Sequence, residues 1–136
     1  MVQATPFLLV LFLALGAHRL SAEQCSLTGH WVNDLGSNMT IGIVNENGDF
    51  TGMYRTAVTA TSNKIEDSPL VGSQHLPNQL NSQPTFGFTV HWNFTDSIAV
   101  FTGQCFVNEH QNEVLKTMWL LRLHANKRED DWKATR

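Results

Sequence analysis

The amino-acid sequence predicts an all-β fold in which short antiparallel strands follow one another as an up-and-down meander. In several segments apolar side chains recur at every second residue, which is the spacing of a half-buried strand. Residues that favour turns separate these segments. Seven segments meet both criteria, with expected bounds of 28–35, 38–45, 50–56, 69–76, 85–95, 97–107 and 113–123.

Turn signals delimit the first four segments. Asn47-Gly48, a dipeptide that favours two-residue hairpin turns, precedes the segment that starts at Phe50. Pro69 opens the fourth segment, and residues 78–84 separate it from the fifth. These signals predict consecutive strands that are joined by short connections.

The fifth segment has the clearest alternation of all. Its apolar side chains take every second position and its polar side chains take the others. The apolar set is Phe86, Phe88, Val90, Trp92 and Phe94. The sixth segment places Phe101 and Cys105 on one face, and the seventh carries apolar residues on both faces. We therefore expect one face of each of these strands to pack against a core.

Length and composition indicate a single domain behind a leader segment. The chain has 136 residues, of which 42% are apolar and 15% are charged, enough for one core. The apolar run at residues 6–15 is too short to cross a bilayer, and small residues follow it near position 21. We expect residues 1–22 to be a secretory signal peptide, cleaved within 21–24, and residues 23–136 to be a secreted domain. A buried N-terminal helix is less favoured, because no later segment has helical periodicity.

Charge and cysteine content narrow the possible partners. Without residues 1–22, eight basic and twelve acidic side chains remain, a formal charge of −4, which argues against nucleic acid. We expect no membrane association. Two cysteines, Cys25 and Cys105, in an oxidising compartment predict one disulfide. Metal ligation is the alternative, but neither cysteine has a second Cys or a His at ligand spacing, so no metal site is expected.

Aromatic and polar residues together suggest a small-molecule site. Trp92, Phe101 and Trp119 lie on the apolar faces of successive expected strands, where their rings could bound a slot for a flat, compact ligand. Any one such aromatic residue is more often simply part of a core. An amide and two hydroxyls that could converge on one carbonyl oxygen favour the slot; they belong to Asn33, Ser37 and Tyr54.

Five segments carry a family resemblance: CSLTGHWVNDLGSNMTIG, FTGMYRTAVTATSN, QPTFGFTVHW, VFTGQCF and EVLKTMWLL. In this order, and at nearly these spacings, they resemble the avidin family of secreted biotin-binding proteins, from Cys25 to Arg136. The resemblance implies an avidin-like eight-stranded β-barrel that sequesters biotin in a pocket at the barrel end and needs no cofactor. Only seven strands are counted and the eighth would follow Arg136, so we expect the domain to be C-terminally incomplete.

The resemblance also assigns roles to single residues. Asn33, Ser37 and Tyr54 would bind the ureido oxygen of biotin, and Thr56 would accept from a ureido N–H. Residues 58–61 would receive the carboxylate in a loop, opposite two hydroxyls. The full expected set is Asn33, Ser37, Tyr54, Thr56, Val58, Thr59, Ala60, Thr61, Trp92, Phe94, Thr95, Ser97, Phe101, Trp119, Leu121 and Trp132.

One position departs from the family pattern. Ala99 stands where family members place a Thr that donates to the ring sulfur of biotin. Alanine has no hydroxyl. We expect the loss of this weak hydrogen bond to cost about 1 kcal/mol of binding free energy.

Trp132 directly follows a charged stretch, residues 127–131, where it has no local apolar partner. On its own this pattern favours a Trp packed against its own barrel end. In avidin-like tetramers the matching Trp instead covers the site of a neighbouring subunit. Met118 and Leu120 take the outer face of the seventh segment, which also indicates a partner surface. We therefore expect a homotetramer if the eighth strand is present.

Two sequons could carry glycans in a secreted chain: Asn38-Met39-Thr40 and Asn93-Phe94-Thr95. Asn38 matches a glycosylation site of the family. Asn93 should point outward beside the pocket mouth if Trp92 points inward, so a glycan there would narrow the access route.

Catalysis is not expected, because the sequence has no G-x-S-x-G or H-E-x-x-H motif and no convincing pair of carboxylates. A lipocalin-like carrier of another small ligand is one alternative, although such a pocket would want aliphatic lining and not three hydrogen-bond donors. A truncated avidin relative with weak or no biotin binding is another. The sequence predicts a secreted, non-enzymatic biotin-binding protein with a host-defence type of role.

Overall fold

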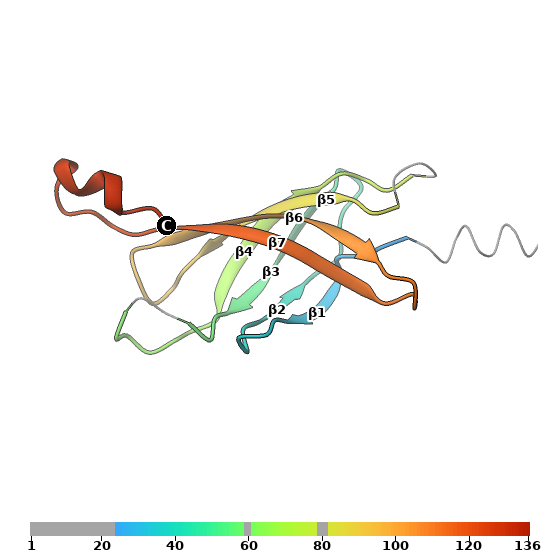
Figure 1. Cartoon of the computed structure of the whole chain (residues 1–136), viewed down its shortest axis with the longest axis horizontal. Coiled ribbons are helices and arrows are strands. Elements are labelled where there is room, and N and C mark those ends of the chain that lie inside the picture. Colours follow the sequence, from blue (N-terminus) through green and yellow to red (C-terminus); the bar gives the residue numbers. More distant parts are fainter. Residues whose placement is uncertain (1–23, 59–60, 79–81) are drawn as a thin grey trace, which may run out of the picture.

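A computed structural model describes residues 24–58, 61–78 and 82–136 of this chain. The expected signal peptide lies outside the described residues. One antiparallel sheet contains all seven strands in sequence order (Figure 1). The strands are β1 (Gly29–Val32), β2 (Asn38–Ile41), β3 (Asp49–Arg55), β4 (Ser68–Gln74), β5 (Thr85–His91), β6 (Ile98–Val107) and β7 (Glu113–Arg122). The predicted all-β meander is confirmed. Within these residues no helix is long and apolar enough to span a bilayer.

The seven predicted strands exist, but several end earlier than expected. β1 stops at Val32 because Asn33 begins a tight turn, in which the Gly36 N–H donates to the Asn33 carbonyl at 3.1 Å. β5 stops at His91, although the buried alternation continues through Trp92 and Phe94 into the following turn. Side-chain burial therefore persists where the strand hydrogen bonds have already ended.

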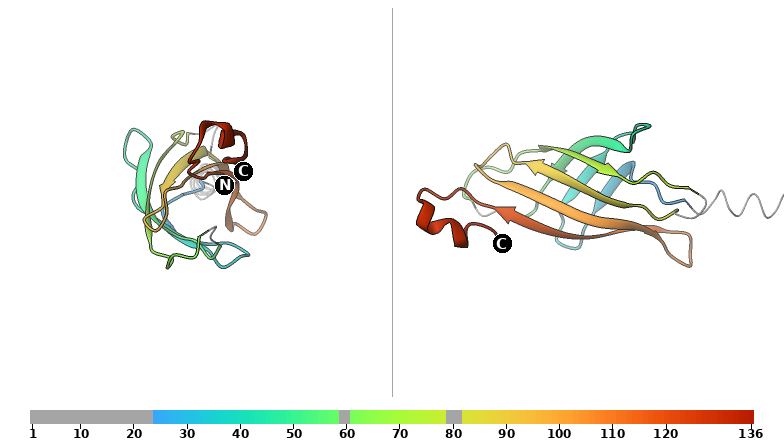
Figure 2. Two further views of the ribbon diagram at one scale, coloured as in Figure 1. Left: turned by 90° about the vertical axis from the view of Figure 1, so that its left-hand side faces the viewer. Right: turned by 90° about the horizontal axis from the view of Figure 1, so that it is seen from above.

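The sheet curls, so its concave face encloses a core while its convex face stays outside (Figure 2, left). Alternate residues of each strand point into this core, as the period of two requires. Full burial of a large apolar side chain contributes roughly 1.5 to 3 kcal/mol. The buried apolar set includes Leu27, Met39, Ile41, Phe50, Leu70, Phe86, Phe88, Val90 and Ala99.

Strand register places three aromatic residues side by side across β5, β6 and β7. Phe88 is paired with Phe101, and Phe101 is paired with Trp119. We call Phe88, Phe101 and Trp119 the aromatic row. The row continues into β4 at Gly72, which is paired with Phe88 and, on its other side, with Phe50. Two large rings thus flank a residue that has no side chain.

Gly72 is required by close packing at this point. A Cβ atom there would lie 2.3 Å from the Gly87 carbonyl oxygen, 2.6 Å from the Phe88 Cβ and 2.7 Å from the Phe50 ring. All three distances are below van der Waals contact, so a larger residue would force β4 and β5 apart.

The predicted disulfide is confirmed. Cys25 and Cys105 are bonded with a Cα–Cα distance of 5.8 Å, and both are buried. The bond ties the segment before β1 to β6 across 80 residues of sequence, which in the chain-entropy view stabilises the fold by about 4 to 5 kcal/mol. Next to it, the Ser26 N–H donates to the Glu113 carboxylate at the start of β7.

β1 and β7 are the two edge strands of the sheet. Among the described residues no strand pairing joins them, and the Ser26–Glu113 contact brings them near each other at one end only. The sheet is therefore an open, curled half-barrel.

Residues 123–136, which we call the C-terminal arm, fold back onto the end of β7. The arm contains a 3-10 helix, η1 (Arg128–Lys133), and extends beyond the sheet before it returns (Figure 2, right). Its last residues lie antiparallel to β7, with an isolated bridge between Arg122 and Thr135.

We predict that Gly72→Ala lowers the free energy of unfolding by about 1 to 3 kcal/mol, because the added methyl overpacks the space between Phe50 and Phe88. Gly87→Ala is the matched control on the next strand, where a Cβ would lie 3.3 Å from its nearest neighbour, the Phe101 carbonyl oxygen. Gly87→Ala should lower the free energy of unfolding by clearly less than Gly72→Ala does. Urea unfolding followed by circular dichroism measures both, and equal stabilities for the two variants would contradict the packing argument.

Candidate functional site

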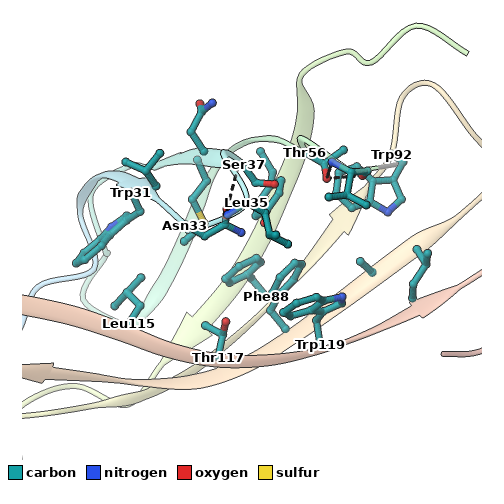
Figure 3. A pocket seen from close by; sticks show the side chains of 18 of the residues that line it. Trp31, Asn33, Leu35, Ser37, Thr56, Phe88, Trp92, Leu115, Thr117 and Trp119 are labelled. Carbon is teal, nitrogen blue, oxygen red and sulfur yellow. Dashed lines mark hydrogen bonds between the residues drawn. The ribbon is translucent and has the colours of Figure 1, made fainter. Parts of the chain in front are cut away.

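A cavity of about 540 Å³ opens on the concave face of the sheet (Figure 3). Its volume is in the range typical of small-molecule sites. Residues from the β1–β2 turn form one wall, and residues from β5, β6 and β7 form the opposite wall. Figure 3 shows Asn33, Leu35 and Ser37 facing Phe88, Thr117 and Trp119 across this space. The site is thus assembled from segments far apart in the sequence.

The aromatic row forms the floor of the cavity. The rings of Phe88 and Phe101 stack with centroids 4.6 Å apart, and those of Phe101 and Trp119 stack at 5.9 Å. Tyr54 lies against the same surface, with its ring 5.3 Å from that of Phe101 and in edge contact with Trp92 at 5.6 Å. Trp119 is 54% exposed because β7 has no strand on its other side. The floor therefore offers flat apolar faces to a ligand.

Asn33 is oriented by its own turn. Its side-chain oxygen accepts the backbone N–H groups of Leu35 at 3.0 Å and Ser37 at 2.9 Å. Both lone pairs of this oxygen are then used. The group that Asn33 offers to the cavity is consequently its amide nitrogen, a hydrogen-bond donor.

Tyr54 and Ser37 form a second polar pair beside Asn33. Burial raises the pKa of the Tyr54 phenol, and a hydrogen bond with the Ser37 side chain partly offsets this rise. The phenol stays protonated at neutral pH and can donate. The Ser37 hydroxyl oxygen also accepts the Ala57 N–H at 2.8 Å, which holds the residues after β3 beside the turn. Together with Asn33, these groups concentrate donors on one side of the cavity.

Thr56 is suited to accepting a hydrogen bond. Its hydroxyl donates to the Val58 carbonyl at 2.6 Å and accepts the Val58 N–H at 3.1 Å. The single hydroxyl proton is committed, while one lone pair of the oxygen is left. A ligand N–H is the complementary group.

The structure brings nine of the expected site residues to this cavity. They are Asn33, Ser37, Tyr54, Thr56, Val58, Trp92, Phe101, Trp119 and Leu121. Ala99, which departs from the family pattern, also lines it and is buried.

The other expected residues lie elsewhere. Phe94, Thr95 and Ser97 line a neighbouring pocket on the far side of Trp92, with Asn63 and His124. Thr61 lines neither space, although its hydroxyl accepts the Asn63 N–H at 3.2 Å in the loop after β3. Thr59 and Ala60 lie outside the described residues.

Trp132 is on the C-terminal arm and does not line the cavity of its own chain. It is 81% exposed, so the alternative in which this ring packs against its own barrel end is not what the structure shows.

Several lining residues were not predicted from the sequence. Leu35 lies between the predicted site residues Asn33 and Ser37, and this position is the sequence feature that could have identified it as a lining residue. Phe88 shares the alternation of Trp92, but only the strand register shows that it stacks on Phe101. The remaining unpredicted lining residues include Trp31, Asn38, Met39, Leu115 and Thr117.

The arrangement is one for binding and not for covalent chemistry. Of the described residues that line the cavity, the charged ones are Glu113 and Arg136, and none is a histidine or a cysteine. A serine without a neighbouring base is not an activated nucleophile. The cavity instead combines flat aromatic faces, preformed donors and an acceptor, which suits a compact ligand that carries a carbonyl and N–H groups.

Comparison with known proteins agrees with this description. The profile of the Avidin family matches residues 21–136. Avidin of Gallus gallus is 63% identical over 139 residues, covering 100% of this chain and 91% of avidin, and avidin-related protein 7 of the same species is 58% identical with the same coverage. The crystal structure of Xenavidin has a TM-score of 0.79 and 54% identity, covering 84% of this chain and 92% of its own. A biotin binding protein from chicken has a TM-score of 0.80 and 54% identity, covering 83% and 92%.

We predict that Tyr54, the single tyrosine of the chain, ionises above its ordinary pKa of about 10 in the native protein and near that value in denaturant. Absorbance at 295 nm then reports this residue alone. Because the folded pKa is raised, the contribution of Tyr54 to stability is present below pH 10 and is lost as the pH rises through the folded value. Ser37→Ala should raise the pKa further. Equal midpoints in native and denatured protein would contradict the burial of the phenol.

Proposed function

This chain belongs to the avidin family, and on that premise we propose that it is a secreted, non-enzymatic protein that binds and sequesters biotin in the cavity described above. The observation that supports this most is the placement of the aromatic row opposite the donors of Asn33 and Tyr54. Biotin has a compact bicyclic head whose ureido group carries one carbonyl and two N–H groups. The flat ring system of biotin suits the aromatic row, and its ureido group suits the hydrogen-bonding groups of Asn33, Tyr54 and Thr56.

The ureido group fits the polar wall. Its carbonyl oxygen can receive the Asn33 amide and the hydroxyls of Tyr54 and Ser37, which would exchange their mutual hydrogen bond for bonds to the ligand. One of its N–H groups can donate to Thr56. These groups are held by bonds within the protein before a ligand arrives, so little side-chain freedom is lost on binding. Tight binding follows from this preorganisation more than from the number of contacts.

The valerate chain would leave past Trp92. Val58 lines the cavity, and Thr95 and Ser97 line the pocket on the other side of Trp92. We assign the carboxylate to this region, and we propose that residues 58–61 bind it together with the Thr95 and Ser97 hydroxyls. Phe94 would cover the chain between them.

Ala99 weakens one contact at the ring sulfur. Its side chain is buried in the cavity wall beside Leu121, with which it is paired. A methyl group there packs but cannot donate. We infer a loss of about 1 kcal/mol compared with a threonine at this position.

The outer face of the sheet supports self-association. Met118 is 77% exposed, and Leu120 and its cross-strand partner Val100 are also exposed on the convex side. Exposed apolar side chains at adjacent positions indicate a surface that a partner covers. We propose that, with an eighth strand present, the protein forms a homotetramer in which Trp132 of one chain covers the cavity of another.

The two edge strands bear on the strength of binding. The cavity is lined by Trp31 from β1 and Leu115 from β7, so it extends to the gap between these strands. An eighth strand along β7 would close this gap. We infer that a polypeptide limited to residues 23–136 binds biotin more weakly than one in which such a strand is present.

The two sequons differ in their surroundings. Asn93 is exposed in the turn after β5, with its side-chain amide donating to the Asp67 carbonyl at 2.9 Å. Asn38 is half-buried in β2 and lines the cavity. We propose both as glycosylation sites of the secreted chain, and Asn93 as the more accessible.

We predict that Trp119→Ala weakens biotin binding by about 3 kcal/mol or more, because it removes a ring that a bound ligand would cover. Titration calorimetry and quenching of tryptophan fluorescence measure the effect. Lys116→Ala is the matched control, since this side chain is exposed on the same strand outside the cavity lining. A chain that bound retinoids or fatty acids and left biotin free in solution would be a lipocalin-like carrier, and the proposed function would be wrong.

A further inference from the structure

Main-chain hydrogen bonds attach the last residues of the C-terminal arm to Leu121 in β7 and to Leu123, the first residue of the arm. The Leu123 N–H donates to the Ala134 carbonyl at 2.7 Å. Leu121 and Arg136 exchange two bonds, with N···O distances of 2.6 Å and 3.0 Å. The backbone between Leu123 and Ala134, which includes η1, is therefore fixed at both ends like a loop.

The Arg122 side chain joins β7 to Asp131 in η1 and to Thr135 near the end of the arm. Its Nη2 donates to the Asp131 carboxylate at 2.6 Å, and its Nη1 donates to the Thr135 hydroxyl at 3.4 Å. A guanidinium has donors in a fixed fork, so two bonds to different groups define its plane. Asp131 directly precedes Trp132. The contact thus links β7 to the residue next to Trp132.

The ion pair between Arg122 and Asp131 is better explained by a role in positioning the arm than by a contribution to folding stability. Both partners are about half exposed, and an ion pair in such a setting contributes little to folding. Trp132, by contrast, is a large apolar side chain held in solvent at 81% exposure. No aromatic ring contact among the described residues includes it. A ring exposed in this way is available to contact a surface outside its own chain.

We propose that Arg122 is a positioning residue, which fixes the C-terminal arm so that Trp132 reaches the ligand cavity of a second copy of this chain. The inference rests on the proposed function, since it needs both the cavity and the assembly. A fixed arm docks with less loss of conformational freedom than a loose one. Arg122 therefore acts through Trp132 to slow the release of a bound ligand.

The test compares variants of the full chain for the rate at which labelled biotin is released into excess unlabelled biotin. Arg122→Ala should release biotin about tenfold faster than the unaltered chain, a change worth about 1.4 kcal/mol. Arg122→Lys should fall between the two, because lysine keeps the charge and loses the fork. Lys133→Ala is the matched control: it removes an ion pair inside the arm, to Asp130 at 3.4 Å, without touching β7. This control should release biotin at the unaltered rate.

A double variant separates positioning from general structural damage. If Arg122 acts through Trp132, Arg122→Ala combined with Trp132→Ala should release biotin no faster than Trp132→Ala alone. Hydrogen exchange at the Leu123 and Ala134 amides gives a readout that needs no ligand, and it should speed up in Arg122→Ala but not in Lys133→Ala. Native mass spectrometry should show the same assembly for all variants.

The possible failures are distinguishable. An unaltered chain that does not bind biotin would contradict the proposed function. If the unaltered chain binds and Trp132→Ala speeds release, while Arg122→Ala has no effect on release or exchange, the positioning role is wrong. Additive effects in the double variant would overturn it as well.

Discussion

The cross-strand register of β5, β6 and β7 is the constraint on which the site depends. It stacks Phe88, Phe101 and Trp119 in one row. It also places Gly72 between Phe50 and Phe88, where a side chain would clash. A slip of one residue in any one of these strands would turn the ring of that strand to the convex face. The same register brings Val100 and Leu120 together on the outer surface. One pairing pattern thus produces both the ligand floor and the face that a partner would cover.

The polar wall, formed by Asn33, Ser37 and Tyr54, depends on hydrogen bonds within and beside one turn and not on strand register. The side-chain oxygen of Asn33 closes the turn after β1, and Ser37 holds the chain that leaves β3 through the Ala57 N–H. Because these bonds exist without a ligand, the donors face the cavity beforehand. A rigid polar wall opposite an aromatic floor is an efficient way to bind a small molecule whose surface is divided in the same manner.

Sequence alone predicts much of this arrangement. Alternation from Phe86 to Phe94 reports burial directly, and the even cysteine count predicts the Cys25–Cys105 bond. The early end of β1 is less visible in the sequence, because it depends on bonds that the Asn33 side chain makes in the folded turn. Leu115 and Phe88 line the cavity through register and curvature, which no local pattern encodes. The contact of Arg122 with Asp131 is likewise tertiary, since the two residues meet only after the arm has folded back.

The central claim is that one ligand occupies the space between the aromatic row and the Asn33–Tyr54 wall. A crystal structure of the chain grown with biotin tests it most directly. The account predicts electron density for the bicyclic head against Phe101 and Trp119, with the ureido oxygen within hydrogen-bond distance of Tyr54. Density for biotin only outside this cavity, for example in the pocket beside His124, would contradict it.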